Sequence, residues 1–157
     1  SGNQLFPDMR QEQSVVDNWK YDPKIEDMTD EDLEQRIVAA MEFENPYRIK
    51  TIPYAGKVSQ TVTYDFAELV ARCPMTGYLD FYRSRITFIP GNLLPELKSL
   101  KFYYYGFADL PISHEHLAAK IHVEYCEVVK PVVCRLELTA GIRGGIETTI
   151  VVGEKEL

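Results

Sequence analysis

The alternation of apolar and polar residues predicts strands in five stretches after about residue 47. Each stretch either alternates strictly or is rich in β-branched and aromatic side chains, as half-buried strands are. The stretches are residues 47–54, 60–66, 83–89, 132–140 and 146–152. A glycine-rich turn at Gly141–Gly145 separates the last two, so we expect them to form a hairpin.

The spacing of apolar residues predicts three helices. One begins after Thr29, a residue type that caps helix N-termini, and spans about 30–43. The other two span about 92–106 and 114–130, each with apolar residues three or four positions apart. Antiparallel strands, two consecutive helices and a closing hairpin indicate an α+β domain with both helices on one face of an antiparallel sheet.

Charge is unevenly distributed and divides the chain in two. The 157 residues have a formal charge of −7, but residues 1–44 alone hold twelve acids and four bases, a net charge of −8. We therefore expect an acidic N-terminal extension at 1–45, carrying one helix, and a near-neutral domain at 46–157. The first 28 residues show no sustained period, which predicts a loop or a partly disordered segment.

Composition excludes several functional classes. No stretch approaches the roughly 20 apolar residues that span a bilayer, and the first residues lack the pattern of a signal peptide. A net-acidic chain is a poor binder of phosphate backbones, so we expect no direct nucleic-acid partner and no membrane. Three cysteines cannot all pair in disulfides, which indicates the reducing cytoplasm.

The first candidate for chemistry is Cys73, in the segment Arg72-Cys-Pro-Met-Thr-Gly-Tyr-Leu-Asp80. Pro74 and Gly77 favour a turn between two strands, which brings Cys73 and Asp80 to opposite sides of one loop. A thiolate is a strong nucleophile, and we expect the Arg72 cation to lower the thiol pKa while Asp80 donates or accepts a proton. A buried structural cysteine in an ordinary turn explains the same residues and is the more common case.

Three further clusters suit proton transfer or an anionic ligand. Lys98 and Lys101 are three apart and share a helix face, where they suit a phosphate-bearing ligand. His114 and Glu115 open the next helix and suit acid–base chemistry and the recognition of a pair of N–H donors. Glycines flank Arg143, so the backbone approaches a ligand while the guanidinium binds its phosphate. A solvated helix face is the more common explanation of such lysines, and a hairpin turn with an exposed arginine is the more common explanation of Arg143. The alternative for Glu115 is that it only stabilises the helix N-terminus through the helix dipole.

Histidines and cysteines in the third predicted helix have spacings found in zinc sites. His122 and Cys126 are four apart, and His114-Glu-His116 is a familiar pair of metal ligands. His116 and His122, however, are six apart on a helix and point in different directions, and the chain has no further histidine. We therefore expect no metal site.

Together these segments resemble one known family. In order and spacing they are similar to the NADPH-dependent 7-cyano-7-deazaguanine reductases, the QueF nitrile reductases of queuosine biosynthesis, in their single-module form. The matching segments are Cys73-Pro-x-Thr-Gly-x-x-Asp80, Glu96-Leu-Lys-Ser-Leu-Lys-Phe-Tyr, His114-Glu115 and Arg143-Gly-Gly. The second is the family's specific signature. The resemblance covers roughly residues 65–150, and the acidic extension takes no part in it.

The resemblance implies a tunnelling fold (T-fold), in which small α+β subunits assemble into homo-oligomeric rings, single or stacked, with active sites between subunits. It implies that Cys73 attacks the nitrile carbon to form a covalent thioimide. Asp80 would protonate the nitrile nitrogen, and His114 would assist around the intermediate. The product is the primary amine of the 7-deazaguanine, a precursor used in tRNA modification.

The resemblance also assigns the binding residues. Glu115 would accept hydrogen bonds from the guanine-like edge of the substrate, with Glu96 as a further contact. Lys98, Lys101 and Arg143 would bind the cofactor NADPH, which reduces the thioimide in two hydride steps. Side-chain cations would then replace the glycine-rich loop of a Rossmann domain.

One departure from the family leaves other functions open. Gly106-Phe107-Ala108 stands where the family usually has Ser-Phe-Arg, which places a cofactor or interface contact in question. A related amidine-forming enzyme shares the thioimide but uses an amine in place of hydride, and the retained cations argue against it. A zinc-dependent pterin enzyme of the same fold needs a histidine set that this chain lacks. A catalytically lapsed purine-binding or assembly module fits the departure.

Overall fold

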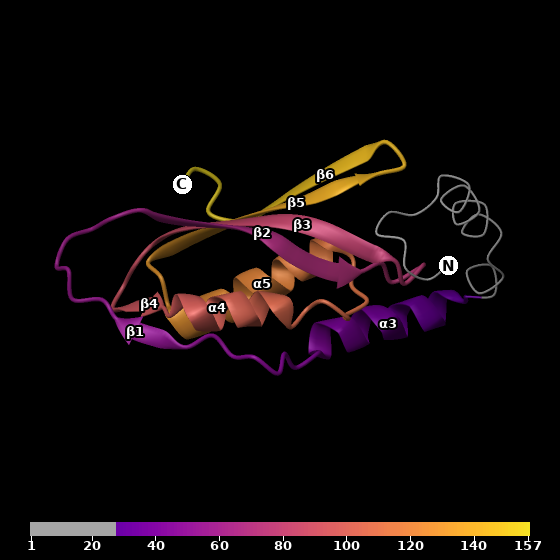
Figure 1. Cartoon of the computed structure of the whole chain (residues 1–157), viewed down its shortest axis with the longest axis horizontal. Coiled ribbons are helices and arrows are strands. Elements are labelled where there is room, and N and C mark those ends of the chain that lie inside the picture. The colour runs from indigo at the N-terminus through magenta and orange to yellow at the C-terminus, as the bar shows by residue number, and fades with distance from the viewer. Residues whose placement is uncertain (1–27) are drawn as a thin grey trace, which may run out of the picture.

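The computed structural model describes residues 28–157, which form three helices and six strands (Figure 1). In chain order these are α3 (Asp30–Glu42), β1 (Thr51–Pro53), β2 (Val62–Arg72), β3 (Leu79–Ile89), β4 (Leu93–Pro95), α4 (Leu97–Tyr105), α5 (His114–Val129), β5 (Val133–Arg143) and β6 (Ile146–Gly153). The segment predicted to be a loop or partly disordered falls outside the described residues, apart from Met28. Within 28–157 we find no helix with the length and apolar character of a membrane span.

The body of the molecule is an antiparallel sheet with two helices on one face. The strand order is β2-β3-β5-β6, and α4 and α5 lie beside each other below the sheet (Figure 1). Fully buried side chains of the sheet, among them Ile86 and Leu136, share one apolar core with Leu117 and Ile121 of α5. The predicted α+β class, with two consecutive helices on one face, is confirmed.

The start of the second predicted helix is wrong. Leu93–Pro95 forms β4, which pairs with β1 in a separate two-stranded sheet. Pro95 disfavours a helical conformation at the preceding residue, so the chain stays extended there although Leu93 and Leu97 have helical spacing. Helix α4 begins at Leu97, and the predicted strand 47–54 shortens to β1.

Three strands are longer than predicted. Strands β2 and β3 extend until only a short loop connects them, and β5 continues to Arg143. The predicted turn is therefore wrong in extent, because Arg143 pairs with Ile146 and the turn consists of Gly144 and Gly145. Both glycines have positive φ, 56° and 80°, as a two-residue hairpin turn requires. Arg143 thus stands on a strand, and its side chain has a fixed direction.

The predicted N-terminal helix is confirmed as α3. Thr29 and Asp32 form a capping box, in which each side chain accepts a hydrogen bond from the other residue's amide. At the other end of α3, Ala40 is buried, and Lys120 of α5 donates a hydrogen bond to the carbonyl oxygen of Met41 at 2.8 Å. The last turn of α3 therefore packs against the domain that follows it.

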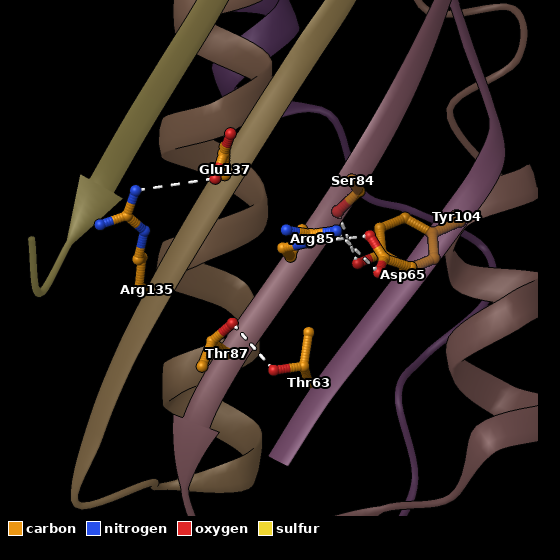
Figure 2. A network of polar contacts seen from close by, with 8 residues as sticks. All are labelled: Thr63, Asp65, Ser84, Arg85, Thr87, Tyr104, Arg135 and Glu137. Carbon is orange, nitrogen blue, oxygen red and sulfur yellow. Dashed lines mark hydrogen bonds and ion pairs between the residues drawn. The ribbon is translucent and has the colours of Figure 1, made fainter. Parts of the chain in front are cut away.

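Polar contacts tie the strands to one another and to α4 (Figure 2). The buried hydroxyls of Ser84 on β3 and Tyr104 on α4 are hydrogen-bonded at 2.9 Å. On the opposite face of the sheet, Arg85 pairs with Asp65 of the neighbouring strand β2 at 3.0 Å. These contacts support the register that determines where the β2–β3 loop lies.

Candidate active site

The loop between β2 and β3 holds Cys73. The Cys73 amide donates a hydrogen bond to the carbonyl oxygen of Tyr78, and the Gly77 amide donates to that of Cys73, both at 2.8 Å. Gly77 has a φ of 74°, which favours glycine, and its carbonyl oxygen accepts a hydrogen bond from the Arg72 guanidinium at 3.0 Å. The result is a closed turn with the cysteine at its entrance.

The Cys73 thiol is half-buried, and this burial raises its pKa. Hydrogen bonds from the hydroxyl and amide of Thr76, the amide of Met75 and the guanidinium of Arg143 lower it by more, so the pKa lies below the usual value of a free thiol. The prediction that Arg72 lowers this pKa is wrong, because that guanidinium binds the loop backbone and a carboxylate of the α4–α5 connection. Donors within the turn and a cation from β5 stabilise the thiolate instead.

Asp80 is a buried acid that shares the Arg143 guanidinium with this thiol. It stands on β3 opposite Ala71, is 3% exposed and forms an ion pair with Arg143. Burial raises the pKa of its carboxyl group, and the charges of Arg143 and His114 oppose the rise without cancelling it. A raised pKa favours the proton-donating form, and the cation stabilises the carboxylate left after proton transfer. Asp80 therefore suits a general acid.

A tyrosine that the sequence analysis missed completes the cluster. Tyr82 is buried, and its pKa is raised by burial and by the charge of Asp80, so its hydroxyl stays protonated. The hydroxyl lies 2.6 Å from Nδ1 of His114, within hydrogen-bond distance, so it orients the imidazole ring. The sequence could have indicated Tyr82, because residues two apart on a strand share a face and Tyr82 is two residues after Asp80 on β3.

Helix α5 contributes two predicted residues from its first turn. The helix starts at His114 and is capped by Ser113, whose side chain accepts a hydrogen bond from a backbone amide of that turn. Glu115 is exposed, and its charge contributes to the raised pKa of Tyr82, so it lies at the edge of the same cluster. The structure thus brings five predicted residues together at one end of the sheet: Cys73, Asp80, His114, Glu115 and Arg143.

The other three predicted residues lie on α4, away from this cluster. Lys98 and Lys101 are exposed, and the carboxylate of Glu96 caps the helix by accepting a hydrogen bond from the Ser99 amide at 2.9 Å. Helix α4 begins near the end of β3, whereas Asp80 stands near its start (Figure 1). An eleven-residue strand such as β3 spans about 35 Å. Within one subunit, these three residues do not reach the thiol.

The departure at Gly106 has a structural basis. Gly106 ends α4, and a Cβ there would collide with the side chain of Asn45. That side chain donates a hydrogen bond to the carbonyl oxygen of Tyr103 at 2.7 Å, which satisfies a backbone acceptor at the open end of the helix. The glycine therefore makes room for a contact from the segment before β1. Nothing in the structure explains Ala108.

Comparison with known proteins agrees with the resemblance seen in the sequence. A family model described as QueF-like protein matches residues 79–157. The chain is 32% identical over 121 residues to the NADPH-dependent 7-cyano-7-deazaguanine reductase of Syntrophus aciditrophicus, covering 76% of this chain and 86% of that protein. It is 39% identical over 98 residues to the reductase of the same name from Frankia casuarinae, covering 62% of this chain and 78% of that protein.

A solved structure has the same fold. The archaeosine synthase QueF-Like in its apo form superposes with a TM-score of 0.54 and 16% identity, covering 63% of this chain and 95% of that chain. This likeness concerns the fold alone and confirms the predicted T-fold. The sequence matches to the reductases, together with the family model, show that the chain belongs to the QueF-like family.

Proposed function

We propose that this chain is a nitrile reductase that converts 7-cyano-7-deazaguanine to 7-aminomethyl-7-deazaguanine with NADPH, a step of queuosine biosynthesis in the cytoplasm. One observation carries the proposal: the Cys73 thiol, of lowered pKa, and the Asp80 carboxyl, of raised pKa, share the cation of Arg143. The similarity to relatives named NADPH-dependent 7-cyano-7-deazaguanine reductase supports the proposal. The free state of all three cysteines is consistent with a reducing compartment.

The first step uses the thiol and the buried acid. The Cys73 thiolate attacks the nitrile carbon, a carbon–sulfur bond forms, and one π bond of the nitrile opens toward nitrogen. Asp80 transfers its proton to that nitrogen, which yields a neutral thioimide and a carboxylate paired with Arg143. Covalent capture converts a nitrile, which resists hydride addition, into a more reducible carbon–nitrogen double bond.

His114 then serves the later proton transfers. Reduction of a nitrile to a primary amine consumes two hydrides and two protons, so a second donor is needed after Asp80 has been used once. The Tyr82 hydroxyl lies 2.6 Å from Nδ1 of His114, so Nε2 is the ring nitrogen left free to face the substrate. We therefore assign His114 as a proton carrier near the intermediate and Tyr82 as the positioning residue that orients its ring.

Binding of the two substrates draws on the remaining predicted residues. NADPH supplies the two hydrides. Lys98 and Lys101 fit its phosphate groups because both are exposed cations on one helix. Arg143 retains donors beyond those bound to Asp80 and Cys73, and we assign these to the cofactor as well. Glu115 would accept hydrogen bonds from the guanine-like edge, with Glu96 as a further contact.

We propose that the complete site forms between subunits of a homo-oligomeric ring. The residues around Cys73 and those of α4 lie apart within one subunit, so a neighbouring copy has to supply one of the two groups. Strands β2 and β6 are edge strands of the described sheet, and such edges pair with other chains unless they are protected. Exposed apolar side chains at the end of the sheet that holds Asp80 and Arg143, among them Phe81, Ile142 and Ile146, offer area for a partner subunit.

Intact-mass measurement with 7-cyano-7-deazaguanine tests the proposal. We expect an adduct of the substrate's mass on the full chain, absent in Cys73→Ala and retained in Cys126→Ala, which removes a thiol outside the cluster. Added NADPH should then discharge the adduct and be oxidised, two equivalents per amine formed.

Two outcomes would contradict this assignment. An adduct that forms but is stable to NADPH would favour the amidine-forming or binding-module alternative. Complete absence of an adduct, with the protein folded, would eliminate the thioimide mechanism.

A further inference from the structure

Three side chains of the metal-ligating types lie together at the end of α5 far from the candidate active site. They are His122 and Cys126 on α5 and Cys134 on β5, and one ligand atom of each lies within 4.8 Å of the other two. Cys134 is buried, and the other two are half-buried. In the part of the chain that the structure describes, this is the one such group of three histidine, cysteine or acidic residues.

The spacing of the ligand atoms suits a tetrahedral zinc ion. Cysteine sulfur and histidine nitrogen bound to one tetrahedral zinc ion lie about 3.5 Å apart, given bond lengths near 2.3 and 2.0 Å. The Cys126 Sγ and His122 Nε2 atoms are 3.7 Å apart. Nε2 also lies 3.4 Å from the carbonyl oxygen of Cys134, which is longer than a normal hydrogen bond and leaves the nitrogen available for a metal.

Local structure explains how the group forms. His122 and Cys126 are one helical turn apart and share a face of α5. After the helix, Lys130 takes a left-handed conformation and the chain reverses into β5, which brings Cys134 back beside that face. Gly153, at the end of β6, covers the group closely, because a Cβ there would collide with the His122 ring and the Cys134 carbonyl oxygen. Three elements therefore meet at these ligands.

This group is separate from the machinery of the proposed reaction. His114 begins α5 and Cys126 lies twelve residues later, about 18 Å along the helix axis. Arg143 and Cys134 likewise stand near opposite ends of β5. Neither thiol has a part in the reaction assigned above, so their proximity calls for another explanation.

We propose that His122, Cys126 and Cys134 bind a zinc ion that ties the C-terminal half of α5 to the start of β5. Two thiolates and one imidazole select zinc over hard cations such as magnesium or calcium. Three protein ligands leave the fourth tetrahedral position open to water, and binding releases the two thiol protons to solvent. The proposal replaces the expectation of no metal, which rested on histidine spacing alone and could not foresee Cys134.

Cobalt titration of the reduced, metal-free full chain tests this site directly. Cobalt(II) in a tetrahedral thiolate site gives a charge-transfer band in the near ultraviolet and intense visible bands. We expect both to saturate at one equivalent and to be displaced by zinc. We also expect zinc to raise the thermal unfolding midpoint, because an ion bound only by the folded state stabilises it.

Variants locate the site on the chain. Loss of a ligand in His122→Gln or Cys126→Ser should weaken cobalt binding by more than about a hundredfold, since second-shell changes alone cost up to that much. Both residues are half-buried, so these variants are expected to fold, which circular dichroism checks. His116→Gln and Cys73→Ser, which change a histidine and a cysteine outside the group, are the matched controls.

Three results would overturn the proposal. The first is that the fully reduced protein shows no thiolate band saturating at one equivalent of cobalt. This result counts equally if Cys126 and Cys134 are joined by a disulfide in the isolated protein and bind no cobalt once that disulfide is reduced. The second is a band that survives in both ligand variants. The third is a band abolished by Cys73→Ser, which would assign the metal to the candidate active site instead.

Discussion

At the scale of single residues, Arg143 connects the two groups that the proposed reaction uses. Its guanidinium pairs with Asp80 and donates to the Cys73 thiol, so it favours the anionic form of each, while burial opposes both anions. The Cys73 thiol also accepts hydrogen bonds from its own loop, so its pKa lies below the usual value of a thiol. The Asp80 carboxyl group has no such donors in its loop, so its pKa lies above the usual value of an aspartic acid. The two pKa values move toward each other, as suits a nucleophile and an acid that act together.

Replacing Thr76 by Val removes the hydroxyl that lowers the Cys73 pKa more than any other single donor does. The thiol pKa should therefore rise, and the thiolate fraction at neutral pH should fall. Rates of iodoacetamide labelling of Cys73 across a pH series, followed by mass spectrometry, measure the midpoint. Thr76→Ser keeps the hydroxyl and should keep the midpoint. An unchanged midpoint in Thr76→Val would contradict this prediction, because it would show that the backbone donors and Arg143 alone keep the Cys73 pKa low.

The sequence predicted those site residues that a single segment holds together. Cys73 and Asp80 flank one turn, and the turn residues Pro74 and Gly77 indicated as much. The contact between Asp80 and Arg143 joins residues 63 positions apart and depends on the length of β5 beyond its predicted end. For that reason Arg72, the neighbour in sequence, was wrongly given the role of the cation beside the thiol.

At the scale of elements, helix α4 is fixed at both ends. Glu96 caps its N-terminus, and the Asn45 side chain binds the carbonyl oxygen of Tyr103 near its C-terminus. Also in this last turn, Tyr104 reaches Ser84 of β3 through a buried hydrogen bond. These three contacts set the position from which Lys98 and Lys101 extend into solvent.

The Ser84–Tyr104 pair gives a stability prediction. Ser84→Ala leaves the Tyr104 hydroxyl buried without its partner, which should lower the free energy of unfolding by about 1–3 kcal/mol. Adding Tyr104→Phe removes the unpaired group, so the double variant should lose less than the sum of the two single variants. Urea unfolding of the four proteins in the cycle measures the coupling energy. Additive losses would show that the two hydroxyls do not stabilise each other.

Element types were easier to predict than element limits. Apolar periodicity identified α5 and both strands of the C-terminal hairpin, because each buries one face against the same core. Periodicity failed at Leu93, where a residue with helical spacing lies in a strand next to Pro95. It also underestimated β2 and β3, whose ends next to the Cys73 loop are held by pairing between strands and not by an alternating pattern.

At the scale of the whole molecule, one subunit carries two incomplete halves of the proposed site. The end with Cys73 and Asp80 holds the reacting groups, and the exposed face of α4 holds the predicted cofactor cations. In the proposed ring each subunit would offer a different surface to each of its two neighbours. If these surfaces are the two halves, a complete site would form at every interface.

Mixing of inactive subunits tests this arrangement. Cys73→Ala retains the α4 half, and Lys98→Ala/Lys101→Ala retains the half with the thiol. When equal amounts are unfolded and refolded together, about one quarter of the interfaces should pair two intact halves if subunits assemble at random. We expect NADPH oxidation to recover to roughly that fraction of the wild-type rate. The NADPH concentration is chosen so that the Lys98→Ala/Lys101→Ala variant alone has no measurable activity.

Mixing Cys73→Ala with Asp80→Ala is the control, because both changes lie in the same half, and this mixture should recover no activity. Equal recovery in both mixtures, or in neither, would show that each subunit forms its site alone.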